Sequence, residues 1–290
     1  MEKNLQHLRT DLAVECLDLN KSDSSGISHY EETIDEIPVT RVKIKTESAS
    51  KSIGKPIGEY ITVETTPFYR FTSDLESQVT VVANEIKKLL PEGLVLVVGL
   101  GNSAITPDAL GPEVIQLIFA TRHLKTNIKD ISGFENLRST ASVAPGVLGQ
   151  TGIETAEIIS GIVNEIKPSA VIVIDALASR ELVRLGATVQ ISDTGITPGS
   201  GVANHRKALT KETLGVPVIS IGVPTVVDVN TIAQDLTGGQ EVSLTYKNSM
   251  MVTPREIDTI IENAAKTIAF GINLALQPNF SLDEIISLVN

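Results

Sequence analysis

The 290-residue sequence contains no tryptophan, a single cysteine and few aromatic side chains, which make up 3% of its residues. The core must therefore consist mainly of isoleucine, valine, leucine and alanine, a composition typical of a parallel sheet covered by helices. The lone Cys16 cannot form an intramolecular disulfide, and no cluster of cysteines exists to bind zinc. We interpret Cys16, in a polar N-terminal segment, as an ordinary thiol of a protein that stays in a reducing cytoplasm.

Positive charge and long apolar runs are also scarce. The formal net charge of -11 and the isoelectric point near 4.9 disfavour nucleic acids and anionic membranes as partners. No segment reaches the ~20 apolar residues that a membrane helix requires, and the first residues contain no apolar run of signal-peptide length. Because 42% of the residues are hydrophobic, we expect a globular protein with a sizeable core that acts on a polypeptide or a small molecule.

The most informative stretch begins with five consecutive apolar residues, Leu94 to Val98, which predict a strand buried on both faces. The turn Gly99-Leu-Gly-Asn102 leads to a loop that holds Asp108, and apolar spacing then predicts a helix over residues 113–121 with Pro112 as its first residue. A dinucleotide-binding turn is disfavoured, because the third glycine of that fingerprint is missing and the carboxylate of Asp108 would repel a phosphate.

The other apolar patterns alternate between strand and helix. We expect antiparallel strands at residues 38–46 and 60–64, and further strands at residues 170–175, 187–192 and 216–222, the last closed by Pro224. We expect helices at residues 73–90, 155–166 and 254–276, one that begins near Ala178, and a solvated connection over residues 18–36. This order predicts an α/β fold with an open, mostly parallel central sheet, helices on both faces and an antiparallel N-terminal extension.

Two carboxylates follow predicted core strands. Asp108 comes after the strand at 94–98, and Asp175 ends the strand at 170–175. If these strands are parallel neighbours, both carboxylates lie at the edge where open α/β sheets bind ligands, separated by one or two strand spacings of ~4.8 Å. A carboxyl pair in a partly desolvated cleft shares one proton, because the pKa of one member rises. The ionised member can then activate water and the protonated member can donate a proton, as amide hydrolysis requires.

Other roles stay open for these and similar residues. Asp108 could stabilise the following helix, where exposed backbone amides favour a carboxylate. The pair could also hold a divalent metal ion, for which the four scattered histidines offer no motif-based third ligand. Asp193 and Asp228 follow strands too, with loop capping as their expected role, and Glu154 is expected in the first turn of a helix. Asp175 is the strongest candidate, because burial beside apolar neighbours makes an unpaired carboxylate costly.

Short segments along nearly the whole chain carry a resemblance to a known family. They are Arg9-Thr-Asp-Leu-Ala-Val-Glu15, Tyr60-Ile-Thr-Val-Glu64, Val97-Val-Gly-Leu-Gly-Asn102, Thr106-Pro-Asp-Ala-Leu-Gly-Pro112, Thr121-Arg-His-Leu124, Pro145-Gly146, Thr151-Gly-Ile-Glu-Thr155, Ile174-Asp-Ala-Leu-Ala178, Gln190-Ile-Ser-Asp193, Pro198-Gly-Ser-Gly201, Pro224-Thr-Val-Val-Asp228 and Met251-Val-Thr-Pro254. With these segments the chain resembles the germination proteases of endospore-forming bacteria, peptidases that degrade small acid-soluble spore proteins.

The resemblance implies a fold similar to that of the hydrogenase-maturation peptidases, with Asp108 and Asp175 as the catalytic pair and no cofactor. It also implies a homotetrameric zymogen of the forespore and spore core, in which residues 1–11 form a propeptide and residues 12–290 a single peptidase domain. The zymogen would cleave itself at Asp11-Leu12. The surrounding Thr10-Asp-Leu-Ala-Val-Glu15 is similar to the family's substrate pattern, so the N-terminus would act as a tethered substrate.

One departure concerns residues 229–250, where many family members carry a longer polar insertion; any role of that insertion is in doubt for this chain. In the hydrogenase-maturation relatives a histidine helps paired acids to bind nickel. No histidine of this chain matches that motif, so we expect no metal. A metal-dependent maturation peptidase is the alternative function, and a binding protein without activity would leave the N-terminus intact.

Overall fold

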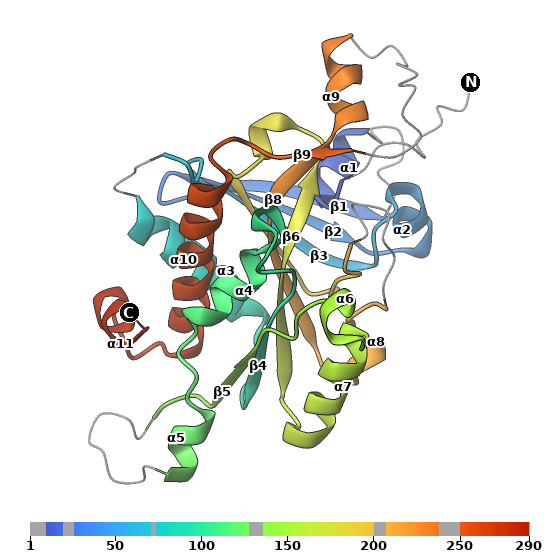
Figure 1. Cartoon of the computed structure of the whole chain (residues 1–290). Helices are drawn as coiled ribbons and strands as arrows, with labels where there is room; N and C mark the ends of the chain where they lie inside the picture. The colour runs from blue at the N-terminus through green and yellow to red at the C-terminus, as the bar shows by residue number, and fades with distance from the viewer. Residues whose placement is uncertain are drawn as a thin grey trace.

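A computed structural model describes residues 10–19, 26–70, 74–127, 136–199, 207–237 and 250–289. Within these ranges nine strands form one sheet in the order β1-β2-β3-β7-β8-β6-β4-β5, with β9 paired to β8 (Figure 1). The strands are β1 (Ile27–Ile34), β2 (Ile37–Ile44), β3 (Gly58–Glu64), β4 (Val95–Gly99), β5 (Thr140–Val143), β6 (Ala170–Ser179), β7 (Thr188–Ser192), β8 (Val218–Asp228) and β9 (Met251–Val252). The predicted α/β fold is confirmed.

The centre of the sheet is parallel, as the unbroken apolar runs predict. Strand β4 pairs in parallel with both β5 and β6, and β6 pairs in parallel with β8. All five residues of β4 are buried, because helices cover both faces of this part of the sheet. Gly99 at the end of β4 lies opposite Ile174 of β6, so Asp175 is one residue beyond the end of its neighbouring strand.

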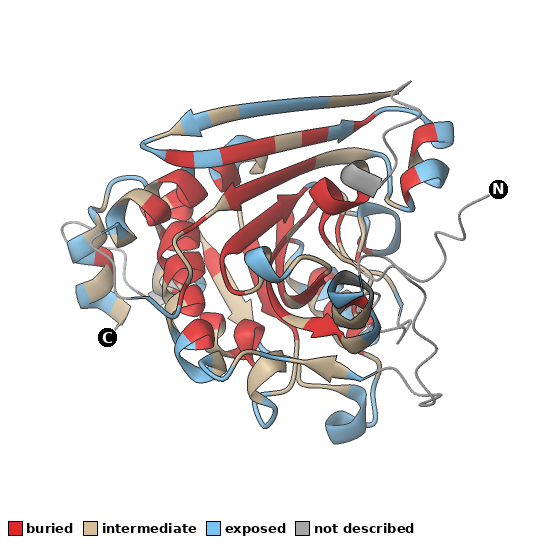
Figure 2. Ribbon diagram, turned by 90° about the horizontal axis from the view of Figure 1, so that it is seen from above, coloured by how far each residue is buried: buried red, intermediate tan, exposed pale blue. Residues whose placement is uncertain are grey.

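The other half of the sheet is antiparallel. Strands β1, β2, β3 and β7 pair in succession, and β7 pairs with β8 at the boundary with the parallel half. The predicted antiparallel N-terminal extension is therefore confirmed, and it gains one strand, β1, within the segment expected to be a solvated connection. Strand β1 lies at the open edge of the sheet with several exposed residues (Figure 2), which explains its polar sequence.

Helices pack on both faces (Figure 1). The helices are α1 (Ala13–Leu19), α2 (Glu47–Ile53), α3 (Leu75–Leu89), α4 (Leu110–Gln116), α5 (Arg122–Asn127), α6 (Leu148–Thr151), α7 (Thr155–Ile166), α8 (Lys211–Leu214), α9 (Val229–Leu236), α10 (Ile257–Leu276) and α11 (Leu282–Val289), with short 3-10 turns η2 (Thr106–Asp108) and η3 (Leu182–Arg184). One core cluster joins α3, α4 and α10 to one face of the sheet. A second cluster joins α7 and α8 to the opposite face.

Three further local predictions are wrong. No helix begins near Ala178, because β6 continues to Ser179 in its pairing with β8. The backbone of Ala178 also forms hydrogen bonds with the N–H and the side chain of Asp11. Pro224 does not close β8, because the pairing of β6 with β8 shifts register next to this residue and accommodates the missing N–H group. Pro112 is the third residue of α4, which runs from Leu110 to Gln116 and not over residues 113–121.

No helix within the described ranges combines the length and apolar character needed to cross a bilayer.

Candidate active site

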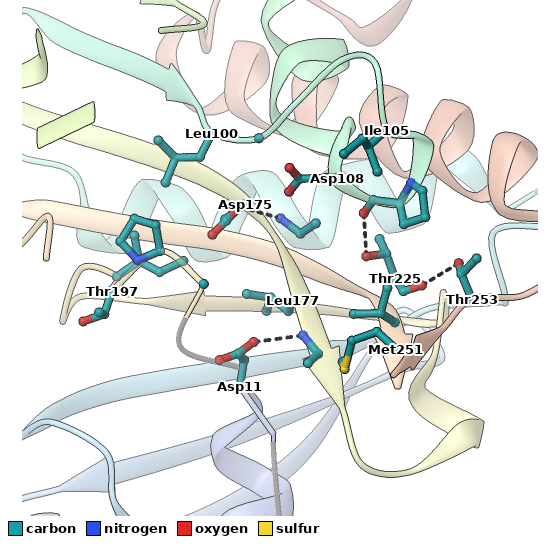
Figure 3. Close-up of a pocket in the computed structure, with 18 of the residues that line it drawn as sticks. Asp11, Leu100, Ile105, Asp108, Asp175, Leu177, Thr197, Thr225, Met251 and Thr253 are labelled. Atoms are coloured by element: carbon teal, nitrogen blue, oxygen red, sulfur yellow. Dashed lines mark hydrogen bonds between the residues drawn. The ribbon is translucent and has the colours of Figure 1, made fainter. Parts of the chain in front are cut away.

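Asp108 and Asp175 line the same cavity, which has a volume of about 360 Å³ (Figure 3). They reach it from neighbouring parallel strands, because Asp175 lies on β6 and Asp108 lies on the turn η2 that follows β4. Asp175 is only 7% exposed, whereas Asp108 is half-buried. The structure thus brings together the two acids that the strand pattern singled out, and their catalytic role stays a prediction.

Backbone amides orient both carboxyl groups. One oxygen of Asp108, Oδ2, accepts a hydrogen bond from the backbone N–H of Asn102 at 3.0 Å, and Oδ1 of Asp175 accepts from the N–H of Ala176 at 3.0 Å. The bond to Asn102 ties Asp108 to the turn directly after β4. Because the turn is anchored at the end of a buried strand, the Asp108 carboxyl has a fixed place relative to Asp175.

Two threonines hold the η2 turn from the opposite side. Thr225 of β8 donates its hydroxyl to the carbonyl of Pro107 at 2.7 Å, and Thr253 donates to the carbonyl of Thr225 at 2.8 Å (Figure 3). These bonds connect the loop of Asp108 with β8 and with the residue after β9. No local sequence pattern indicates a role for either threonine, because their contacts join segments far apart in the chain.

The N-terminal segment lies directly beside this cavity, and Asp11 is one of the lining residues (Figure 3). The N–H of Asp11 donates to the carbonyl of Ala178 at 2.9 Å, and Oδ2 of Asp11 accepts from the N–H of Ala178 at 2.9 Å. The next side chain, Leu12, is fully buried and packs against Leu177 and Ile196. The segment is therefore held beside the end of β6 by one backbone hydrogen bond, one side-chain hydrogen bond and the packing of Leu12.

Glu15 anchors the other end of this segment. Its carboxyl is fully buried and accepts hydrogen bonds from the backbone N–H groups of Arg180 and Glu181, at 2.8 and 2.9 Å, and from the hydroxyl of Thr10. The guanidinium of Arg184 lies 3.9 Å away. The pKa of Glu15 is nevertheless raised, because burial outweighs the hydrogen bonds that favour the ionised form.

This raised pKa makes the anchor pH-dependent. A carboxyl whose pKa is higher in the folded state contributes stability that is complete below its ordinary pKa of 4.5 and is lost as the pH rises through the raised value. We expect the amides of α1 to exchange faster, relative to their intrinsic rates, as the pH rises from roughly 4 to 8. Hydrogen-exchange mass spectrometry should show this trend in the wild type and lose it in Glu15→Gln. The exposed Glu47→Gln on α2 is the matched control, and a wild type that shows no trend would contradict the argument.

The other candidates lie outside the cavity lining. Asp193 accepts a hydrogen bond from the N–H of Glu59 at 2.8 Å, and Asp228 accepts from the N–H of Asn230 at 2.8 Å, so both carboxylates orient loop or strand backbone. Glu154 is the residue that precedes α7. In the part of the chain that the structure describes, no group of three His, Cys, Asp or Glu side chains is placed to hold a metal ion. His29 and His123 are exposed, and His7 and His205 lie outside the described residues.

Cys16 is buried in α1, not in a loose polar segment as expected. It packs with Val42, Ile44 and Tyr60. Burial also raises the pKa of its thiol, which keeps the sulfur protonated and unreactive. The interpretation as an ordinary thiol is therefore consistent with its surroundings.

The family model and the similar proteins that match this chain all carry the same family description. The family model of the germination protease matches residues 6–238. The germination protease of Caldanaerobacter subterraneus subsp. tengcongensis is 46% identical over 98% of both chains, and that of Clostridium perfringens is 43% identical over 99% of this chain and 100% of its own. The protein from Geobacillus sp. is 37% identical over 98% and 97%. Its alignment spans 363 positions, more than the 290 residues of this chain, so that relative contains residues that this chain lacks.

Among solved structures, a [NiFe] hydrogenase maturation protease from Thermococcus kodakarensis covers 65% of this chain and 98% of its own. The sequence identity is 19% and the TM-score is 0.35.

Proposed function

This chain belongs to the germination protease family, and from that premise we propose that it is an endopeptidase that starts the degradation of small acid-soluble spore proteins. In this proposal it is made as a homotetrameric zymogen of the forespore, residues 1–11 are the propeptide, and the bond between Asp11 and Leu12 is cleaved by the chain itself. Asp108 and Asp175 activate water for this hydrolysis.

One observation supports the proposal above all others. Asp11, the residue before the proposed cleavage point, lines the same cavity as Asp108 and Asp175. These three residues are far apart in the sequence, and a propeptide without a role in the site would have no reason to lie there. The N-terminal segment is held beside β6 by the two hydrogen bonds between Asp11 and Ala178 and by the packing of Leu12.

The two carboxyl groups supply the proton transfers of hydrolysis. The ionised carboxylate removes a proton from water, whose oxygen forms a bond to the carbonyl carbon of Asp11, and the carbonyl oxygen takes up the electron pair. The C–N bond to Leu12 then breaks as the protonated carboxyl gives its proton to the leaving nitrogen. The products are a carboxyl terminus at Asp11 and an amino terminus at Leu12. Either aspartate can take either role in this scheme.

The tethered segment also indicates which substrates fit. Leu12 fills an apolar site, Ala13 is fully buried, and the Glu15 carboxyl is bound by backbone N–H groups. A substrate in the same place therefore needs a large apolar residue after the cleaved bond, then a small residue, and a carboxylate three positions after the apolar one. This is the pattern proposed for the spore-protein substrates.

Intact-mass spectrometry of the purified protein, before and after incubation at mildly acidic pH, tests the proposal. We expect a product that lacks residues 1–11, together with cleavage of an added small acid-soluble spore protein. A chelator should leave both rates unchanged, because two carboxylates are too few protein ligands for a catalytic zinc site. A stable N-terminus would contradict self-processing, and activity lost on chelation and restored by a divalent ion would favour the metal-dependent alternative.

A further inference from the structure

The carbonyl oxygen of Asp11 accepts hydrogen bonds from two side chains that have no assigned role. The ammonium of Lys55 donates from Nζ at 3.0 Å, and the side-chain amide of Gln190 donates from Nε2 at 2.9 Å. This carbonyl belongs to the bond between Asp11 and Leu12. Both donors therefore contact the very oxygen that would become negatively charged if water attacked this bond.

Gln190 is placed by the sheet itself. It lies on β7 opposite Gly222 of β8, and Gly222 lies opposite Asp175 of β6. Residues that pair across a sheet point to the same face, so the Gln190 and Asp175 side chains leave the same face two strand spacings, or roughly 10 Å, apart. The position between them has no room for a side chain, because a Cβ on Gly222 would lie 2.6 Å from Leu177 Cγ.

Gln190 holds the peptide at two points. While its Nε2 donates to the carbonyl of Asp11, its Oε1 accepts from the N–H of Ala13 at 2.7 Å. The two bonds lie on either side of Leu12, so they fix the orientation of the peptide group that precedes it. Gln190 is only 8% exposed and lies on a buried strand. Its two hydrogen bonds to the peptide are therefore held in place before any reaction occurs.

Lys55 brings a positive charge to the same oxygen. It follows Gly54, the residue directly after α2, and its Nζ also donates to the carbonyl of Thr10 at 3.2 Å. Both acceptors are neutral carbonyls of the N-terminal segment. An ammonium that faces a carbonyl gains far more when that oxygen becomes an anion than it gains in the ground state, which is the property required of an oxyanion-binding group.

We propose that Lys55 and Gln190 form the oxyanion-binding site for cleavage of the Asp11–Leu12 bond. The inference rests on the proposed function and adds two catalytic residues to it. As the water oxygen bonds to the carbonyl carbon, the π electron pair moves to the carbonyl oxygen, and the charge that develops there is bound by the Nζ and Nε2 hydrogens. When the C–N bond breaks, the electron pair on the oxygen re-forms the C=O bond of the new main-chain carboxyl terminus at Asp11. Water is the only reactant needed.

Three variants test this proposal by the rate of self-processing, followed by intact mass. Lys55→Met removes the charge at similar length, and Gln190→Glu retains an acceptor for Ala13 but places a negative oxygen beside the carbonyl of Asp11. Each should slow processing by about 10²-fold or more, the usual effect of losing one oxyanion donor. Lys55→Arg, which keeps the charge, should recover part of the rate. A merely structural role would not distinguish Arg from Met in this way.

Matched controls are available on the same chain. Lys51→Met removes a positive charge at an exposed position of α2 and is the control for Lys55→Met. Gln116→Glu repeats the Gln-to-Glu substitution at the exposed last residue of α4 and is the control for Gln190→Glu. Both control variants should process at the wild-type rate. Thermal melts identify any variant that is not folded. If Gln190→Glu is unfolded, the rates of the two Lys55 variants alone test the oxyanion-binding role. Wild-type rates in Lys55→Met would overturn this inference while leaving the proposed function intact. Failure of the wild type to process would instead overturn the proposed function.

Discussion

Asp175→Asn and Asp108→Asn are each expected to slow removal of residues 1–11 by about 10²- to 10⁴-fold, the range attributed to a single acid or base. Asparagine keeps the size of the side chain and can still accept a hydrogen bond from Ala176 or Asn102. It can neither take a proton from water nor give one to the leaving nitrogen. A time course of intact mass at fixed pH measures the effect.

Asp193→Asn is the matched control for this prediction. Asp193 also follows a core strand, but it orients the backbone at Glu59 and does not line the cavity. The same loss of charge there should leave processing unchanged. Circular dichroism and the oligomeric state, expected to be a tetramer, should be the same in all variants. Rapid processing in both Asp108→Asn and Asp175→Asn would remove the pair from the mechanism.

Gly101→Ala is expected to damage both the fold and the site. Gly101 has a φ of 116°, a conformation that residues with a side chain rarely adopt. A Cβ at this position would lie 1.9 Å from the backbone carbonyl oxygen of Asp108, so the η2 turn must move. We expect a loss of more than about 1 kcal/mol in the free energy of unfolding, and about 10²-fold slower processing because a shift of 1 Å misplaces the Asp108 carboxyl.

Gly161→Ala provides the comparison for this second prediction. Gly161 lies in the middle of α7 on its exposed side, and a Cβ there would meet no atom within 4 Å. Alanine should therefore stabilise the helix by up to ~1 kcal/mol and leave processing unchanged. Urea unfolding followed by circular dichroism measures both variants. If Gly101→Ala unfolds at the same urea concentration as the wild type and processes normally, the described fit of Gly101 against Asp108 is wrong.

The parallel centre of the sheet could be predicted because its information is local. The apolar runs that became β4 and β6 each end near a carboxylate, and neighbouring parallel strands bring such ends to one edge. The position of the cavity thus followed from two short segments. Gln190 gives a weaker sequence signal, a polar residue between two apolar residues of a strand. Its neighbours Val189 and Ile191 point to the opposite face of the sheet, into the core.

The features that could not be predicted depend on contacts between distant residues. Strand β6 continues past Asp175 because its residues up to Ser179 pair with β8. Asp11, 167 residues away from Ala178, adds hydrogen bonds to Ala178 there. The polar strand β1 forms only because β2 offers it an edge. Likewise, the donors to the Asp11 carbonyl come from a loop after α2 and from β7, and no local pattern links Lys55 with Gln190. Tertiary contacts of this kind override local propensity.

Asp108 and Asp175 are proposed to hydrolyse peptide bonds together. The most direct test is the kcat for a peptide containing Thr-Asp-Leu-Ala-Val-Glu, measured with chains that begin at Leu12, because these need no self-processing. We expect kcat to fall by about 10²-fold or more in Asp108→Asn and in Asp175→Asn, and to be unchanged in Asp193→Asn. A wild-type kcat in either of the first two variants would contradict the account.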